Sequence, residues 1–258
     1  MIDSHCHLDS PNNHDDAHTL IVAARAAGVS ALVTIGCDAR SAGVVIDIAS
    51  RYPDVFAAIG FHPHDAKDYS PERERELRER AVHPKVVAIG EIGLDFYRDH
   101  SPRDTQREVF RAQLRLAAEL GMPIVIHARE SFAEAFAITC EFVTQLTGVV
   151  FHCFSEGVKE AEMVFARGWR ISVGGAVTYK NSRMAEVAAM APLDQLLLET
   201  DAPYISPEPF RGKVNQPAYL RYTLEKVAQI KGLPVAEVEI ATDHAARTLF
   251  HLPDPGSR

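Results

Sequence analysis

Short runs of consecutive apolar residues, many of them β-branched, recur along the whole chain. Longer stretches with apolar residues at helical spacing separate them. Because the short runs are continuous rather than alternating, they are typical of parallel strands that are buried on both faces. The runs lie at 2–4, 31–36, 55–60, 86–91, 123–127, 149–153, 170–175 and 195–200.

The intervals between the runs predict helices, for example over 18–28, 105–121 and 161–168. Several of these stretches end in glycine, as helix C-termini often do. Successive runs mostly lie about 25–35 residues apart, which is the length of a βα unit. Eight such units predict a (β/α)8 TIM barrel that forms a single domain over residues 1–258. An open doubly wound sheet is the alternative, but no GxGxxG motif follows the first run.

Two further stretches complete the predicted fold. Residues 234–250 predict an extra C-terminal helix, and the charge-rich stretch 70–80 predicts a helix with a solvated face. No linker, low-complexity tract or second domain is visible in the sequence.

Composition narrows the class of protein. The chain has 258 residues, of which 47% are hydrophobic, so a sizeable core is expected. No apolar run approaches the roughly 20 residues of a membrane span, and the N-terminus lacks the pattern of a secretory signal. The four cysteines show no CxxC spacing, so we expect a reduced, cytoplasmic protein. A net charge of −8 argues against a broad basic surface for nucleic acid, although a local cationic cleft stays open.

Side chains that can bind metal ions end or follow six of the eight runs. In a barrel, the carboxyl ends of all strands meet on one face, where catalytic sites lie. We therefore expect these side chains, although distant in sequence, to gather in one pocket. They are His5, His7, His62, His64, Glu91, His127, His152 and Asp201.

Imidazole and carboxylate groups together suit Zn, Mn, Fe or Ni and, less specifically, Mg. His5 and His7 share one face of a strand, whereas Cys6 points the other way and is expected to be a buried packing residue, like Cys153. Glu91 would bridge two ions roughly 3.5–4 Å apart, a common hydrolytic device. Each residue alone also fits a structural role, such as a hydrogen-bonded histidine or a helix cap. The joint pattern favours a metal site.

With these residues in place, the sequence resembles the TatD family of metal-dependent deoxyribonucleases, in the amidohydrolase-like TIM-barrel group. Seven blocks in the same order carry the resemblance. They are DSHCHLD (3–9), GFHPH (60–64), GEIGLDFY (90–97), PIVIHARE (123–130), HCFS (152–155), LLETDAPY (197–204) and RGKVNQP (211–217).

The resemblance implies two divalent ions per chain, of Mg, Mn or Zn, and leaves a third open. His5, His7, Glu91 and Asp201 would surround one ion, and Glu91, His127 and His152 the other. It also implies cleavage of phosphodiester bonds in DNA, typically by 3′-to-5′ exonuclease action on single strands. Glu91 stands where many relatives in the wider group carry a carboxylated lysine, and this favours a nuclease.

Four positions depart from the family pattern, and none of them is an expected metal ligand. The family usually has glycine directly after HCFS, and here Glu156 intervenes before Gly157. Val214 and Gln216 replace an arginine and a glutamate, and His244 replaces an asparagine. These departures affect the expected substrate preference and loop geometry rather than the hydrolytic core.

The expected reaction uses Asp201 as general base toward water, with Glu91 as the second catalytic residue. His62 and His64 would bind a further ion, contact substrate phosphate or complete a turn around Pro63. Arg129 would hold phosphate by its planar fork or close a structural salt bridge.

The loop after the last run and two aromatic residues are further candidates for substrate contact. Arg211 and Asn215 would contact the substrate from this loop, and Phe154 or Tyr204 would stack on a base or pack within the protein.

Two other functions compete with the nuclease. One is an amidohydrolase-type esterase or lactonase, including ester cleavage on charged tRNA, because an activated hydroxide also attacks carbonyl groups. The other is a catalytically silent scaffold that binds nucleic acid or a partner. The intact set of six ligands argues against the scaffold, and the oligomeric state stays open.

Overall fold

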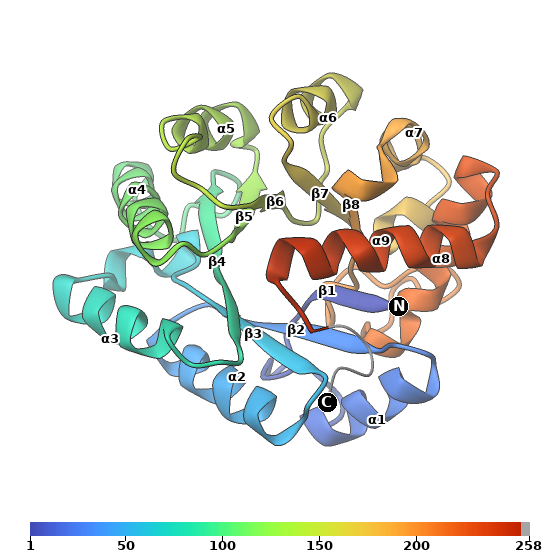
Figure 1. Ribbon diagram of the computed structural model, residues 1–258, viewed down its shortest axis with the longest axis horizontal. Coiled ribbons are helices and arrows are strands. Elements are labelled where there is room, and N and C mark those ends of the chain that lie inside the picture. The colour runs from blue at the N-terminus through green and yellow to red at the C-terminus, as the bar shows by residue number, and fades with distance from the viewer. Residues whose placement is uncertain (254–258) are drawn as a thin grey trace. The chain divides into compact units, whose positions relative to one another are not determined.

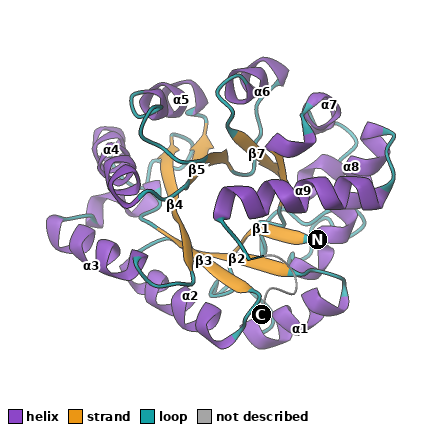
Figure 2. Ribbon diagram, viewed as in Figure 1, coloured by secondary structure: helices purple, strands orange, loops and turns teal. Residues whose placement is uncertain are grey.

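A computed structural model describes residues 1–253 of the chain. Strands and helices alternate along it, and the strands follow one another in the sheet in chain order, β1 to β8 (Figures 1 and 2). The strand pairs with a described register are parallel. The strands are β1 (Ile2–Cys6), β2 (Ala31–Gly36), β3 (Val55–Ile59), β4 (Val86–Asp95), β5 (Ile124–Arg129), β6 (Val149–Phe151), β7 (Arg170–Val173) and β8 (Leu196–Leu198).

The strands form because their continuous apolar sequences are buried on both faces. Every residue of β1, β2, β3, β6 and β8 is buried, as parallel strands covered by helices require. The predicted run at 31–36 coincides with β2. The run at 86–91 continues four residues further, to the end of β4 at Asp95. The runs at 149–153 and 195–200 end earlier than predicted, so that their last residues lie in the loops that follow.

Helices connect the strands. The α-helices are α1 (Ala17–Ala26), α2 (Ala39–Arg51), α3 (Pro71–Ala81), α4 (Arg103–Leu120), α5 (Phe132–Cys140), α6 (Val158–Phe165), α7 (Met184–Met190), α8 (Leu220–Lys231) and α9 (Val235–Phe250). Short 3-10 helices are η1 (Pro63–Asp68), η2 (Gly175–Thr178), η3 (Leu193–Gln195) and η4 (Pro217–Tyr219). None of the helices in residues 1–253 has the length and apolar character needed to cross a membrane.

Local sequence explains where several helices begin and end. Asp16 and Asp38 cap α1 and α2 by accepting hydrogen bonds from backbone N–H groups three residues later, as N-cap side chains commonly do. Gly121 and Gly232 end α4 and α8 in the left-handed conformation that glycine adopts readily. The charge run forms α3, of which Leu77 and Ala81 are buried, and the predicted terminal helix forms α9.

The chain divides into two compact units, which we describe separately. The terminal unit contains residues 1–34 and the described residues from 153 onward, and the central unit contains residues 35–152. The prediction of one domain over 1–258 stays a prediction, and its residues 254–258 lie outside the described part.

In the terminal unit, α9 holds the start of the chain. Helix α9 lies beside α8 (Figure 1) and contacts β1. The Met1 ammonium group lies 2.7 Å from a carboxylate oxygen of Glu239, and the Ile2 N–H donates to Asp243 over 2.7 Å. These contacts fix the first strand, which contains His5 and is followed by His7.

In the central unit, α4 holds the ends of two neighbouring strands. Gln113 is fully buried; its amide oxygen accepts from the Phe61 N–H and its amide nitrogen donates to the Phe61 carbonyl. Gln106 makes the same pair of hydrogen bonds with the backbone of Asp95. Buried amides of this kind cost little free energy only when both ends are paired. They fix the residues that follow β3 and end β4.

Candidate metal centre

The central unit brings five predicted metal or substrate residues together. Strands β3 to β6 are neighbours in the sheet, so the residues at their carboxyl ends come close in space. His62 and His64 follow β3, Glu91 lies in β4, His127 lies in β5, and His152 follows β6. We call these five residues together with Asp95 the central cluster.

Glu91 lies at the centre of the central cluster. Its Oε1 atom lies 2.6 Å from Nδ1 of His127, 2.7 Å from Nε2 of His152 and 3.4 Å from Nε2 of His62. The Glu91 side chain is only 4% exposed. One carboxylate oxygen thus faces three imidazoles in a site that is nearly closed to solvent.

The electrostatics of the central cluster favour a charged carboxylate. Burial raises the pKa of Glu91, but the charge of His152 and the hydrogen bonds from His127 and His152 outweigh it, so its pKa lies well below the usual value. Burial lowers the pKa of His62 to about 4. His62 is therefore neutral near pH 7 and offers a lone pair. A carboxylate with neutral imidazole is the donor set that divalent metal ions use.

Asp95 completes the central cluster, and sequence reasoning missed it. Its Oδ2 atom lies 3.0 Å from Nε2 of His127 and 2.9 Å from Nε2 of His64. Its other oxygen accepts from the N–H groups of Tyr97 and Arg98. Burial raises the pKa of Asp95, but the hydrogen bonds from His127 and His64 outweigh it, and the pKa lies below its usual value. Asp95 thus orients His127 so that Nδ1 faces Glu91.

Gly93 explains how β4 and β5 come close enough for these contacts. It pairs with His127 across the two strands and has φ of 141°, a conformation that residues with a Cβ rarely adopt. A Cβ at this position would lie 2.0 Å from the His127 carbonyl oxygen. Only glycine fits at position 93 while the two strands keep this register.

The terminal unit brings His5, His7 and Asp201 together. Nε2 of His5 and Nε2 of His7 lie 3.3 Å apart, and Oδ1 of Asp201 lies 3.7 Å and 3.4 Å from them. Backbone hydrogen bonds set this geometry, because the Asp201 N–H donates to the His5 carbonyl and the His7 N–H to the Ala202 carbonyl. Asp201 has a left-handed φ of 53°, a strained conformation often found at functional sites. We call these three residues the terminal cluster.

Two buried carboxyl groups support the terminal cluster. Asp3 accepts hydrogen bonds from the N–H and hydroxyl of Thr200, at 2.9 and 2.6 Å, and burial raises the pKa of Asp3 to about 7. Glu199 accepts from the Cys153 N–H over 2.7 Å and from the Ser172 hydroxyl. The acidic positions around Asp201 thus hold the segment from Glu199 to Asp201 in place.

The predicted substrate contacts have different surroundings. Arg129 is exposed, and its guanidinium lies 4.0 Å from the centre of the Tyr97 ring. Arg211 is exposed and lies 4.3 Å from the Tyr179 ring centre. Both cations are held over an aromatic face and stay accessible. Asn215, in contrast, is buried within its loop.

Asn215 is 1% exposed and holds its loop from inside. Its amide nitrogen donates to the carbonyl oxygens of Thr200 and Tyr204, both over 2.7 Å, and its amide oxygen accepts from the Gln216 N–H. These internal bonds explain the asparagine at this position. Substrate contact by Asn215 stays a prediction, and no exposed surface supports it.

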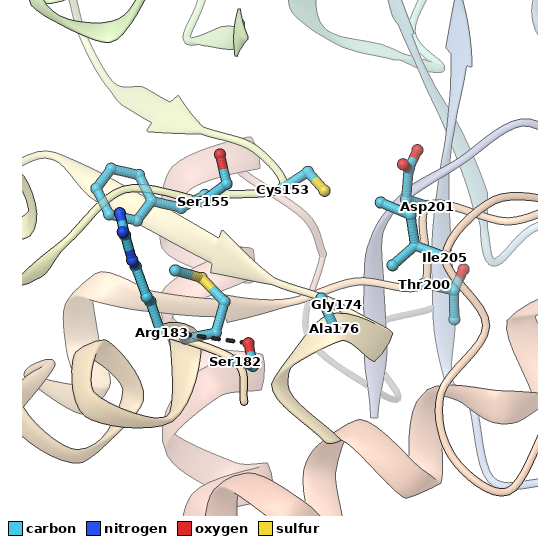
Figure 3. A pocket seen from close by; sticks show the side chains of 11 residues that line it. Cys153, Ser155, Gly174, Ala176, Ser182, Arg183, Thr200, Asp201 and Ile205 are labelled. Carbon is cyan, nitrogen blue, oxygen red and sulfur yellow. Dashed lines mark hydrogen bonds between the residues drawn. The ribbon is translucent and has the colours of Figure 1, made fainter. Parts of the chain in front are cut away.

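A cavity of about 200 Å³ lies beside Asp201 in the terminal unit. It is lined by Cys153, Phe154, Ser155, Gly174, Ala176, Ser182, Arg183, Met184, Thr200, Asp201 and Ile205. Figure 3 shows Cys153 and Asp201 facing each other across it, with Arg183 on the side far from Asp201. The packing prediction holds for Cys6, which is fully buried, whereas Cys153 is partly exposed and lines the cavity.

The central cluster fits a divalent ion on geometric grounds. His62, Glu91 and His127 each offer one ligand atom, and these atoms lie within 4.8 Å of one another. The three residues are buried or half-buried, and their donor set is that of hydrolytic metal centres. The presence of His62 among them shows that it belongs to the cluster rather than only to the turn at Pro63.

Comparison with known proteins now defines the class of protein. The family described as TatD related DNase matches residues 2–251. The chain therefore belongs to the TatD family, within the amidohydrolase-like TIM-barrel superfamily, and it is a metal-dependent hydrolase. This confirms the resemblance drawn from the seven sequence blocks.

Particular relatives cover nearly the full length of both chains. An uncharacterized metal-dependent hydrolase of Bacillus subtilis, YabD, is 38% identical over 98% of this chain and 99% of its own. The 3′-5′ ssDNA/RNA exonuclease TatD of Escherichia fergusonii is 36% identical over 97% of this chain and 98% of its own. The crystal structure of YJJV, a TatD homologue from Escherichia coli, superposes with a TM-score of 0.92 at 32% identity and covers 98% of each chain. This likeness confirms the predicted fold, a (β/α)8 barrel with eight parallel strands and a C-terminal helix.

Proposed function

We propose that this hydrolase cleaves phosphodiester bonds in single-stranded DNA and removes nucleotides from the 3′ end. The observation that carries the proposal is the central cluster, where one oxygen of Glu91 lies within 2.7 Å of His127 and His152. A buried carboxylate among imidazoles suits the metal-assisted hydrolysis of phosphate esters. The relative from E. fergusonii, described as a 3′-5′ ssDNA/RNA exonuclease, supports the choice of substrate and direction.

The proposed metal centre uses residues from both clusters. His5, His7 and Asp201 would supply one half and Glu91, His127 and His152 the other, with Glu91 shared by two divalent ions. The barrel fold supports this proposal, because the carboxyl ends of its strands form one catalytic face. His62 and His64 would serve a third ion or the substrate phosphate. Mg, Mn and Zn are the candidate metals.

The side chains of this protein would divide the work as follows. When bound, the ions supply a water of lowered pKa and neutralise charge on the phosphate. Asp201 accepts the proton of the attacking water. Asp95 accepts a hydrogen bond from the Nε2–H of His127 and so orients the ring, whose Nδ1 would give up its hydrogen bond to Glu91 in order to bind an ion.

Two exposed cations would bind the substrate outside the metal centre. Arg129 and Arg211 present guanidinium groups that can donate two parallel hydrogen bonds to a phosphate. Each guanidinium lies over a tyrosine ring, which already restricts the side chain. The side chain therefore loses less conformational entropy when it binds phosphate. A cytoplasmic location, as the sequence suggested, stays a prediction.

A cleavage assay tests the proposal. Single-stranded oligonucleotides with a blocked 3′ end or a blocked 5′ end are incubated with the protein and Mg, Mn or Zn, with and without a chelator. We expect stepwise shortening of the 5′-blocked strand, protection of the 3′-blocked strand and no reaction with chelator. Cleavage of a panel of esters and lactones without cleavage of either strand would contradict the proposal.

A further inference from the structure

The cavity beside Asp201 is built like a site for a flat ring. Phe154, Met184 and Ile205 give it apolar walls, and Gly174 and Ala176 leave room between them. Arg183 and Asp201 lie on opposite sides of it (Figure 3), and Ser155, Ser182 and Thr200 are also part of its lining. An aromatic residue with apolar neighbours and a few polar groups is the usual lining of a base-binding pocket.

The size of the cavity limits what it can hold. Its volume of about 200 Å³ is below the roughly 300–1,000 Å³ typical of sites for drug-sized ligands. One ring system fits this space, whereas two nucleotides do not. Because Asp201 lines the cavity, an occupant would lie next to the residue to which we assign the proton transfer.

Glu156 follows Ser155, which lines the cavity, and it is half-buried. Burial raises the pKa of Glu156 and repulsion from Glu160 adds to the rise, whereas the positive charge of Arg183 opposes it. Glu156 and Arg183 therefore lie close enough to interact, although Arg183 itself stays exposed.

We propose that this cavity binds the base of the nucleotide released at the 3′ end, and that Arg183 donates hydrogen bonds to acceptor atoms on the far edge of that base. The proposal rests on the proposed nuclease function and adds a binding site to it. Stacking on an aromatic ring accepts any base. The guanidinium of Arg183 only donates hydrogen bonds, so it would need an acceptor atom on the base. Phe154 would supply the aromatic wall, and the phosphate would lie toward Asp201.

Alkylation of Cys153 tests occupancy without any turnover. Cys153 lines the cavity and is partly exposed, so iodoacetamide labelling, followed by peptide mass spectrometry, reports whether the cavity is filled. Deoxycytidine 5′-monophosphate should slow labelling of Cys153 about 10-fold at saturation, whereas 2-deoxyribose 5-phosphate should not. Labelling of Cys37 and Cys140, also partly exposed, should not change. Equal protection by the two compounds, or none, would overturn the proposal.

Kinetics with paired substrates give a second test. An oligonucleotide with a normal 3′ nucleotide is compared with one whose 3′ residue lacks the base. Wild type should favour the normal strand about 10-fold or more in kcat/KM, in line with the loss expected for one stacked base. Ala176→Leu, which fills the cavity, should remove this preference. Ala189→Leu, at an exposed position of α7 outside the cavity, should keep it.

Three substitutions of charged residues test the role of Arg183. Arg183→Ala should reduce the preference for the normal strand, whereas Lys180→Ala, which removes an exposed cation that does not line the cavity, should not. Glu156→Gly should strengthen the preference, because it frees Arg183 from a competing carboxylate. An unchanged preference in Ala176→Leu and Arg183→Ala would exclude the cavity as the base site.

The two proposals fail in different ways. If the protein cleaves neither strand under any metal, the nuclease proposal fails, while base-dependent protection of Cys153 still measures binding in the cavity. If wild type cleaves both strands equally and the nucleotide does not protect Cys153, the nuclease proposal stands and the base site is wrong. Thermal melting of each variant shows whether the fold is retained.

Discussion

The central and terminal clusters hold carboxylate and imidazole groups in different ways. In the central cluster one oxygen of Glu91 lies within 2.7 Å of two imidazole nitrogens, and Asp95 supports His127 from behind. In the terminal cluster Asp201 lies 3.4 and 3.7 Å from its histidines and lines a cavity. The tight, supported group is suited to hold an ion by itself, and the looser one is suited to help hold a second ion where substrate enters.

Glu91→Gln should have the largest effect. It removes the charge that the imidazoles of the central cluster surround, and metal-ion catalysis is worth several kcal/mol, so we expect kcat/KM on single-stranded DNA to fall about 10³-fold or more. Bound metal, measured by mass spectrometry, should fall too. Glu108→Gln, at an exposed position of α4, is the control. Near-normal activity and metal content in Glu91→Gln would show that Glu91 does not hold the metal.

Asp201→Asn should reduce turnover while leaving the central cluster intact. Loss of a general base typically costs about 10²–10⁴-fold in rate, and we expect the loss in kcat. The central cluster should still bind metal, which titration of the metal-free protein would show. Asp15→Asn, in an exposed loop, serves as the matched substitution. Complete loss of metal in Asp201→Asn would mean that the two clusters do not differ as described.

Asp95→Asn should weaken metal binding to a smaller degree. Groups that hydrogen-bond to a metal ligand typically account for about 10–100-fold in affinity, and Asp95 accepts from two histidines. The metal dissociation constant should rise by that factor, and excess metal should restore most of the activity. If excess metal restores nothing, Asp95 does more than orient His127.

Arg211→Ala should have the smallest effect of these four. Its exposed guanidinium would contribute charge-assisted hydrogen bonds to phosphate, worth about 1.5–3 kcal/mol, so KM should rise roughly 10–100-fold with kcat little changed. Arg115→Ala, which removes an exposed cation from α4, should leave KM unchanged. A fall in kcat alone would place Arg211 in the chemistry rather than in binding.

The fold was largely predictable from the sequence because buried parallel strands leave a simple signal. Each predicted run contains or overlaps a strand, and α9 begins and ends almost where predicted. The least accurate boundary was the end of β4, which lies four residues beyond the predicted run. That end depends on hydrogen bonds with a neighbouring strand, such as the pairing of Gly93 with His127, which no single run reveals.

The site was predicted unevenly, for identifiable reasons. His127, His152 and Glu91 meet as expected, because each lies in or just after the carboxyl half of its strand. Asp95 was missed because the strand was assumed to end at Glu91, although positions 91, 93 and 95 share one strand face. That spacing was the available signal. Arg183 gave no signal, because only the folded loops bring it to the same cavity as Asp201.

We propose that residues of both clusters hold paired divalent ions. Anomalous diffraction from crystals of the manganese-loaded protein is the sharpest test of this proposal. We expect two manganese peaks about 3.5–4 Å apart, both in contact with Glu91, one near His5 and His7 and the other near His127 and His152. A single peak, or two peaks that do not share Glu91, would contradict it.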